Sequence, residues 1–106
     1  MAKYLFKGSY VGKGIEGLMK EGGTARREAA SKVMASVGGT LECFYYAFGQ
    51  DDVVGVVDLP DVASATAVSL IINSSGAVNL KLTPLITPEE VDAASKKKPS
   101  YRPPGQ

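Results

Sequence analysis

The sequence predicts an α+β domain built as a two-layer sandwich, with its strands and helices in the order βαββαβ. Three observations support this fold. Four segments are rich in β-branched and aromatic residues, two segments repeat apolar residues at spacings of three and four, and glycine or proline marks the turns. The chain has 106 residues, of which 44% are apolar and 22% charged, so one small globular domain is expected.

The first strand and the first helical region lie near the N-terminus. Residues 2–11 form a strand-like segment in which apolar and aromatic residues recur with a period near two. Residues 13–37 carry one apolar stripe at helical spacing, and the glycine pair at 22–23 predicts a break within it. We expect Thr24 to cap the second part and the glycine pair at 38–39 to end it.

A hairpin and a second helix follow. Residues 40–48 and 53–59 are predicted strands, and the short polar segment 49–52 between them has the length of a hairpin loop. Asp61 is expected to be the N-cap of the second helix, which ends at the polar segment 74–76.

The last predicted strand covers residues 77–86, where apolar and polar residues alternate. Pro84 predicts an edge position or a strand end, because proline cannot donate to the ladder. Thr87 is expected to cap one short helical turn. We therefore expect a domain over residues 1–90 and a flexible C-terminal tail over 91–106, which has too little apolar content to pack.

Four strands and two helices in this order define the ferredoxin-like, or split βαβ, arrangement, with both helices on one face of a four-stranded antiparallel sheet. Alternation along residues 40–48 gives two apolar sides, with Phe44, Tyr46 and Phe48 on one and Leu41, Cys43, Tyr45 and Ala47 on the other. A sheet with a solvated face should alternate apolar and polar residues instead. The uncovered face is therefore predicted to pack against a second copy, giving a homodimer or higher homo-oligomer of the dimeric α+β barrel type. The alternative is that this face tolerates exposure.

Charge and rare residue types exclude several classes of function. Residues 1–95 hold eight basic and eleven acidic side chains, so no nucleic-acid partner is expected, and the basic tail is interpreted as solvated. No apolar run could span a bilayer and no signal-like segment opens the chain, so we expect no membrane partner and a cytoplasmic location. One cysteine and no histidine exclude an intramolecular disulfide and a histidine-based triad or zinc site. No metal or other cofactor is expected.

A group of basic and aromatic side chains is the strongest candidate for a ligand site. It consists of Lys7, Arg26, Tyr45 and Lys81, with Tyr4, Tyr10 and Tyr46 as further lining. This mixture would suit a small aromatic or acidic ligand held between sheet and helix. The alternative is an interface rim, where tyrosine is common. Arg26 falls on the apolar stripe of its helix, where a charge needs a partner or must reach outward.

Two weaker candidates lie in and before the hairpin. The neighbouring carboxylates Asp51 and Asp52 could take a cation or a polar ligand, but together with Gly49 they are more typical of a turn. Cys43 would need a positive environment to act as a nucleophile, and its apolar neighbours favour a small core residue instead. We assign no catalytic residue.

Several short segments together resemble one known family. They are Lys3-Tyr4-Leu5, Gly14-Ile15, Gly38-Gly39, Phe44-Tyr45, Gly49-Gln50-Asp51-Asp52 and Leu59-Pro60-Asp61. On these segments the chain resembles the GYD-domain proteins, which are small bacterial proteins named for a Gly-x-Tyr-Asp hairpin. Gly49 and Asp52 match that hairpin, whereas Asp51 stands where the family usually has tyrosine. The resemblance implies a dimeric α+β barrel and carries over no activity, substrate or catalytic residue.

Three functions are compatible with the sequence. The first is a homo-oligomeric domain that binds a small ligand or a partner protein at or near the subunit interface. The second is a cofactor-independent enzyme, such as an oxygenase or isomerase acting on a small aromatic substrate, by analogy at the level of the fold. The third is a structural subunit of a larger assembly. The lack of a recognisable catalytic constellation favours the first.

Overall fold

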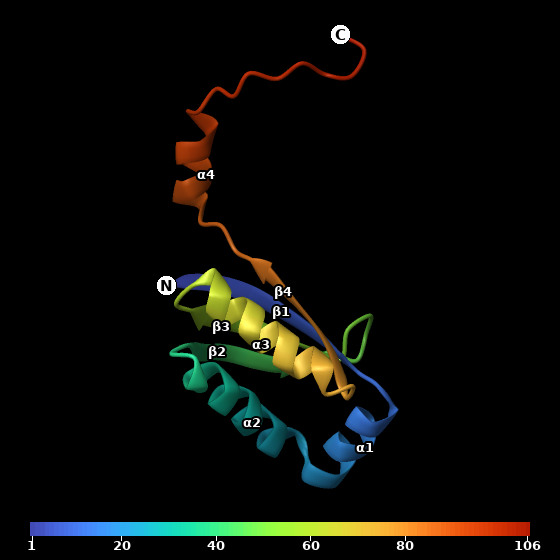
Figure 1. Cartoon of the computed structure of the whole chain (residues 1–106). Coiled ribbons are helices and arrows are strands. Elements are labelled where there is room, and N and C mark those ends of the chain that lie inside the picture. The colour runs from blue at the N-terminus through green and yellow to red at the C-terminus, as the bar shows by residue number, and fades with distance from the viewer.

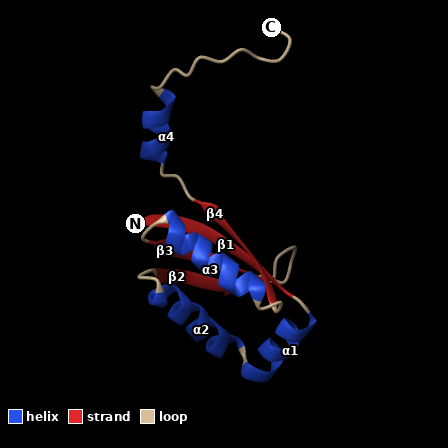
Figure 2. Cartoon of the chain, viewed as in Figure 1, coloured by secondary structure: helices blue, strands red, loops and turns tan.

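The computed structural model describes residues 1–106 as a four-stranded antiparallel sheet and four helices. The elements are β1 (Ala2–Tyr10), α1 (Gly12–Glu21), α2 (Gly23–Ser36), β2 (Thr40–Tyr46), β3 (Val53–Leu59), α3 (Val62–Ser74), β4 (Val78–Pro84) and α4 (Pro88–Ser95). The strand order is β2-β3-β1-β4, and α2 and α3 lie side by side over one face of the sheet (Figures 1 and 2). The predicted ferredoxin-like α+β fold is confirmed. Pro84 ends the edge strand β4, as its chemistry required.

The predicted break in the first helical region falls at Gly22, whose φ of 88° only glycine adopts without strain. Its backbone N–H donates to the Leu18 carbonyl at 2.8 Å, which ends α1, and Gly22 itself is the N-cap residue of α2. The predicted cap at Thr24 is therefore wrong, because α2 already begins at Gly23 and Thr24 lies inside its first turn. The predicted C-terminal glycine signal is confirmed by Gly38, with a φ of 81°.

The other two predicted caps are confirmed. The Asp61 carboxylate accepts a hydrogen bond from the Ser64 backbone N–H at 2.7 Å. Thr87 and Glu90 form a reciprocal capping box at the start of α4. The helix continues to Ser95, so ordered secondary structure extends past the predicted domain boundary at residue 90.

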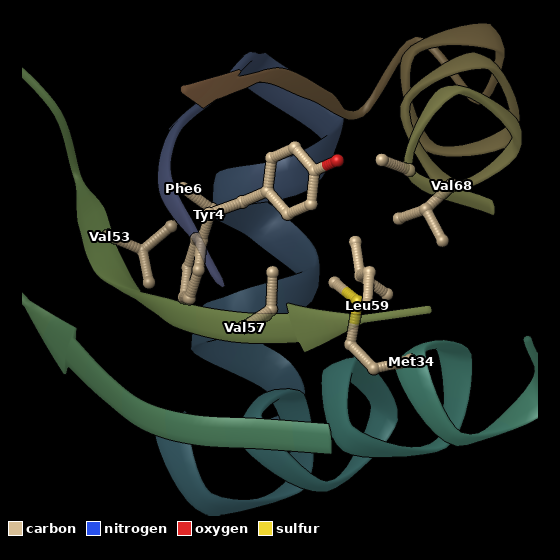
Figure 3. Close-up of a cluster of buried hydrophobic side chains, with 8 residues drawn as sticks. Tyr4, Phe6, Met34, Val53, Val57, Leu59 and Val68 are labelled. Carbon is tan, nitrogen blue, oxygen red and sulfur yellow. The ribbon is translucent and has the colours of Figure 1, made fainter. Parts of the chain in front are cut away.

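The core lies between the sheet and its covering helices (Figure 3). Its buried residues are Tyr4, Phe6, Met34, Val53, Val57, Leu59, Ala65 and Val68. Helix α2 packs against β2, whereas α3 packs against β4 and β3. Each helix therefore lies over one edge of the same sheet face. The space between the two helices lies above the central strands.

A β-bulge at Glu42 changes the faces of β2. Leu41 pairs with Val57 and Cys43 pairs with Val56, so the register shifts by one residue between them. Leu41 consequently lies on the helix side together with Phe44, not beside Cys43 as simple alternation predicted.

The face of the sheet away from the helices, called the open face below, is divided in two. Its β2–β3 half carries apolar side chains, among them Tyr45, Val54 and Val56, and Leu5 on β1 continues this patch. Its β1–β4 half is polar, with Lys7, Ser9, Asn79, Lys81 and Thr83. The prediction of an apolar second face therefore holds for only half of the sheet.

None of the four helices combines the length and the apolar content that a membrane-spanning helix needs.

Candidate functional site

The structure separates the predicted ligand residues between the two sides of the sheet. Tyr45 pairs with Val54, Val54 with Lys7, and Lys7 with Lys81, so these side chains form one row across the open face. Arg26 lies on α2, on the helix side. Three of the four residues thus share a surface, and the sheet lies between them and Arg26.

The open face has a basic corner and an acidic corner. Lys7 and Lys81 are cross-strand neighbours, neither forms an ion pair, and they make up the basic corner. Glu42 and Asp58 make up the acidic corner, where both contact Lys3. The hydrogen bond to Glu42 is the main reason that the pKa of Lys3 is raised above its ordinary value.

On the helix side, an apolar cleft of about 110 Å³ lies between α2 and α3. The sheet contributes Phe6, Leu41, Phe44, Val53, Val78 and Leu80 to it, and the two helices contribute Ala29, Ala30, Val33, Met34 and Ile72. Tyr10 and Arg26 complete the lining, and Arg26 is the only charged side chain. The cleft exists because α2 and α3 lie over opposite edges of the same sheet face, α2 over β2 and α3 over β4.

A polar pocket of about 130 Å³ adjoins the apolar cleft, and the two share Tyr10, Arg26 and Val78. Lys13 and Glu21 on α1 are its other charged residues, and Arg26 Nη1 lies 3.3 Å from Glu21 Oε2. An apolar space therefore opens into a pocket with two cations and one anion.

The wall of the polar pocket depends on a close approach of α1 to β4. A side chain at Gly14 would overlap the Ala77 carbonyl, which accepts the Val11 backbone N–H at 3.0 Å. Gly17 also lines the pocket, but nothing lies within 4 Å of where its side chain would begin. Only a glycine at position 14 allows the start of α1 to lie this close to β4.

Tyr46 holds the start of α2, and hence the turn that carries Arg26. Its hydroxyl donates to the Gly23 carbonyl at 3.0 Å. Burial, reinforced by the neighbouring Tyr10, raises the pKa of Tyr46 to about 12. The ring stacks on Phe48 at 5.7 Å and packs edge-on to Phe44 at 5.2 Å between centroids.

The hairpin loop has a structural role through Asp52. Its Oδ2 accepts the Tyr10 backbone N–H at 2.8 Å, and its own N–H donates to the Gly8 carbonyl at 2.9 Å. These contacts tie the loop to the end of β1. The carboxylates of Asp51 and Asp52 do not belong to any cluster of three potential metal ligands.

Cys43 lies half-buried on the open face, not in the core between sheet and helices where its apolar neighbours had suggested. It pairs with Val56, and alternation with Phe44 and Tyr46, which face the helices, puts it on that face.

Sequence reasoning missed Lys13 and Glu21 as pocket residues. The sequence does contain a pattern that links them. Lys13, Gly17 and Glu21 recur every four positions and so share one face of α1. What the sequence did not contain was the direction of that face, which depends on the turn at Gly22 and the contact at Gly14.

Comparison with curated proteins and with solved structures finds no match for this chain. The model of the GYD domain matches residues 4–94, from Tyr4 near the start of β1 to the last turn of α4. Because the match covers most of the chain, this protein belongs to the GYD domain family.

Proposed function

We propose that this GYD-domain protein binds a small organic acid with an apolar body in the space between α2 and α3. The observation that carries this proposal is the junction of the apolar cleft with the polar pocket at Tyr10 and Arg26. A ligand with an apolar end and an anionic end would match both environments, and Arg26 can contact its anion from the shared wall.

The size of the cleft limits the ligand. Its volume of about 110 Å³ is somewhat below the roughly 150 Å³ apolar cavity that accommodates benzene. The apolar body of the ligand can therefore be no larger than one small ring or a short alkyl chain, with the carboxylate in the polar pocket. Binding would exchange the Arg26 contact with Glu21 for one with the ligand, and a solvent-accessible ion pair of this kind is inexpensive to break.

Calorimetric titration with phenylacetate and hexanoate, compared with the neutral 1-hexanol, tests the proposal. Arg26→Gln should weaken binding of both acids roughly tenfold and leave the alcohol unchanged, since one charge-assisted hydrogen bond is lost. Arg27→Gln, at the exposed neighbouring position, is the matched control and should bind as the natural chain does. Ala30→Phe should abolish binding of all three by filling the cleft. Equal affinities for Arg26→Gln and Arg27→Gln would overturn the assignment of Arg26.

We propose as a second function that two copies associate through their open faces. The apolar patch formed by Leu5, Tyr45, Val54 and Val56 is the surface to be covered. The acidic and basic corners lie diagonally opposite each other, so a two-fold axis along the other diagonal brings unlike charges together. The same surface is therefore complementary to itself. Partner and ligand would occupy opposite faces of the sheet.

Sedimentation at micromolar concentration tests this association. The natural chain should sediment as a dimer, and Val54→Asp should give a monomer, because Val54 lies on the proposed axis and two carboxylates would be buried against each other. Met19→Asp replaces an exposed apolar side chain on α1, away from the open face, and should leave the dimer intact. A natural chain that stays monomeric would contradict the proposal.

A further inference from the structure

The segment Leu85–Ser95, called the arm below, extends away from the rest of the chain. After Pro84 the chain leaves the sheet, and α4 stands clear of the other helices (Figure 1). The molecule measures 56 × 33 × 23 Å, and its radius of gyration of 17.0 Å exceeds the roughly 13 Å expected for 100 compact residues. One backbone hydrogen bond, from Leu85 N–H to the Lys3 carbonyl at 2.9 Å, holds the root of the arm.

The arm has features that are typical of an element packed against other parts of a protein. Its helix begins with a full capping box, and the family match extends through most of it. Its apolar side chains are nevertheless exposed, at 40% for Leu85, 68% for Ile86 and 55% for Val91. An isolated helix of eight residues is marginal in water, so a stable α4 requires tertiary contacts, of which its own copy supplies few.

A groove suited to the arm lies beside the place where the arm begins. It has a volume of about 250 Å³ and runs between the end of β4 and the first half of α3. It is lined by Tyr4, Val62, Ala65, Thr66, Leu82 and Pro84, together with Ser69, and so contains no charged side chain. Val62 on its rim is 73% exposed. The arm of the same copy points away from this groove.

The symmetry of the proposed dimer brings each arm to the groove of the other copy. The two-fold axis that matches the acidic corner with the basic corner runs along the diagonal that ends at Pro84. Both arms therefore leave the dimer next to each other, at the axis. Residues 85–87 can extend over about 10 Å, which equals the usual spacing of two packed sheets.

The geometry points to a reciprocal exchange in which residues 85–87 of each copy cross to its partner and α4, through Val91, covers the groove beside Val62 of that partner. This inference rests on the proposed association through the open faces. The occupant is a second copy of this chain, since the apolar side chains of the arm and the uncharged groove are both uncovered and meet across one axis.

Directed cross-linking tests the exchange in the full chain. In a Cys43→Ser background, one chain carries Val91→Cys and a differently tagged chain carries Val62→Cys. Mixing and mild oxidation should give a covalent heterodimer of the two tags. A mixture of Val91→Cys with Arg27→Cys, which lies on α2, is the control and should give little.

Charged substitutions in the arm provide the second readout. Ile86→Asp with Val91→Asp should weaken the dimer roughly tenfold or more, because one charge would lie on the crossing segment and the other in an uncharged groove. Tyr101→Asp, exposed beyond the arm, should not. Ile86 and Val91 are largely exposed in a single copy, so these variants should fold normally.

The outcomes separate the two proposals. The exchange would be overturned if the arm substitutions left dimer affinity unchanged and Val91→Cys cross-linked to position 62 no better than to position 27. Association through the open faces would then still stand. A natural chain that is monomeric at micromolar concentration would overturn both.

Discussion

The rings of Phe6 and Phe44 lie 5.8 Å apart between centroids, although their strands are not neighbours. Gly55 on the intervening strand β3 pairs with both residues. Because glycine has no side chain, the two rings meet above its backbone. A methyl group there would overlap the Phe6 ring on one side and the Cys43 carbonyl on the other.

Gly55→Ala should therefore destabilise the protein by roughly 1–3 kcal/mol, the usual cost of overpacking a core. Gly12→Ala is the contrasting variant, because nothing lies within 4 Å of its would-be side chain at the start of α1. It should be neutral or slightly stabilising. Urea unfolding of both variants measures the difference, and equal stabilities would contradict the role given to Gly55.

Tyr46 should titrate above the ordinary range of a tyrosine. Its pKa is raised to about 12, chiefly by burial, so its folded form keeps the proton where the unfolded form loses it. The contribution of Tyr46 to stability is thus present below its unfolded pKa and lost as the pH rises from about 10 to about 12. Ultraviolet titration should show a late phenolate step that Tyr46→Phe removes. The step surviving in that variant would assign it to another tyrosine.

The Asp61 cap should stabilise the protein at neutral pH but not at acidic pH. The hydrogen bond from Ser64 lowers the pKa of Asp61, so its stabilisation is present above its ordinary value and is lost as the pH falls below about 4. At pH 7, Asp61→Ala should lower the melting temperature by a few degrees, whereas at pH 3 the difference should shrink. Thr24→Ala, which removes a hydroxyl that makes no cap, should have little effect at either pH. An equal loss at both pH values would argue against this linkage.

Charge matching across the open faces should be reversible. Lys81→Glu should weaken the dimer, because two acidic corners would then face each other, and adding Glu42→Lys should restore it. High salt should reduce both effects. Lys32→Glu, on the exposed side of α2, is the control. Sedimentation at two salt concentrations measures the changes, and an additive loss in the double variant would contradict the proposed axis.

The sequence was sufficient to predict the order of the elements and most of their ends. Alternation and helical spacing located the strands and helices, and Asp61 and Thr87 marked their helix starts correctly. The errors arose where one residue alters the local geometry. The bulge at Glu42 moved Leu41 to the other face, and the positive φ of Gly22 replaced the expected cap at Thr24.

The site was harder to predict because it depends on the relation between elements. Periodicity indicated which residues share a strand or helix face, but not that Lys7 and Lys81 point away from Arg26. The conflict of a charged Arg26 on an apolar stripe was the useful signal, since it marks the place where the cleft meets the polar pocket.

The two glycines that border the polar pocket from α1 differ in how freely they can change. Any side chain at Gly14 would clash with the Ala77 carbonyl and force α1 away from it. Position 14 must therefore remain glycine if α1 is to keep its place beside β4. Gly17 faces free space in the same polar pocket. A larger residue there would reduce the pocket volume without displacing the elements that line it. Substitution at position 17 can therefore reshape the polar pocket, while a glycine at position 14 preserves the architecture around it.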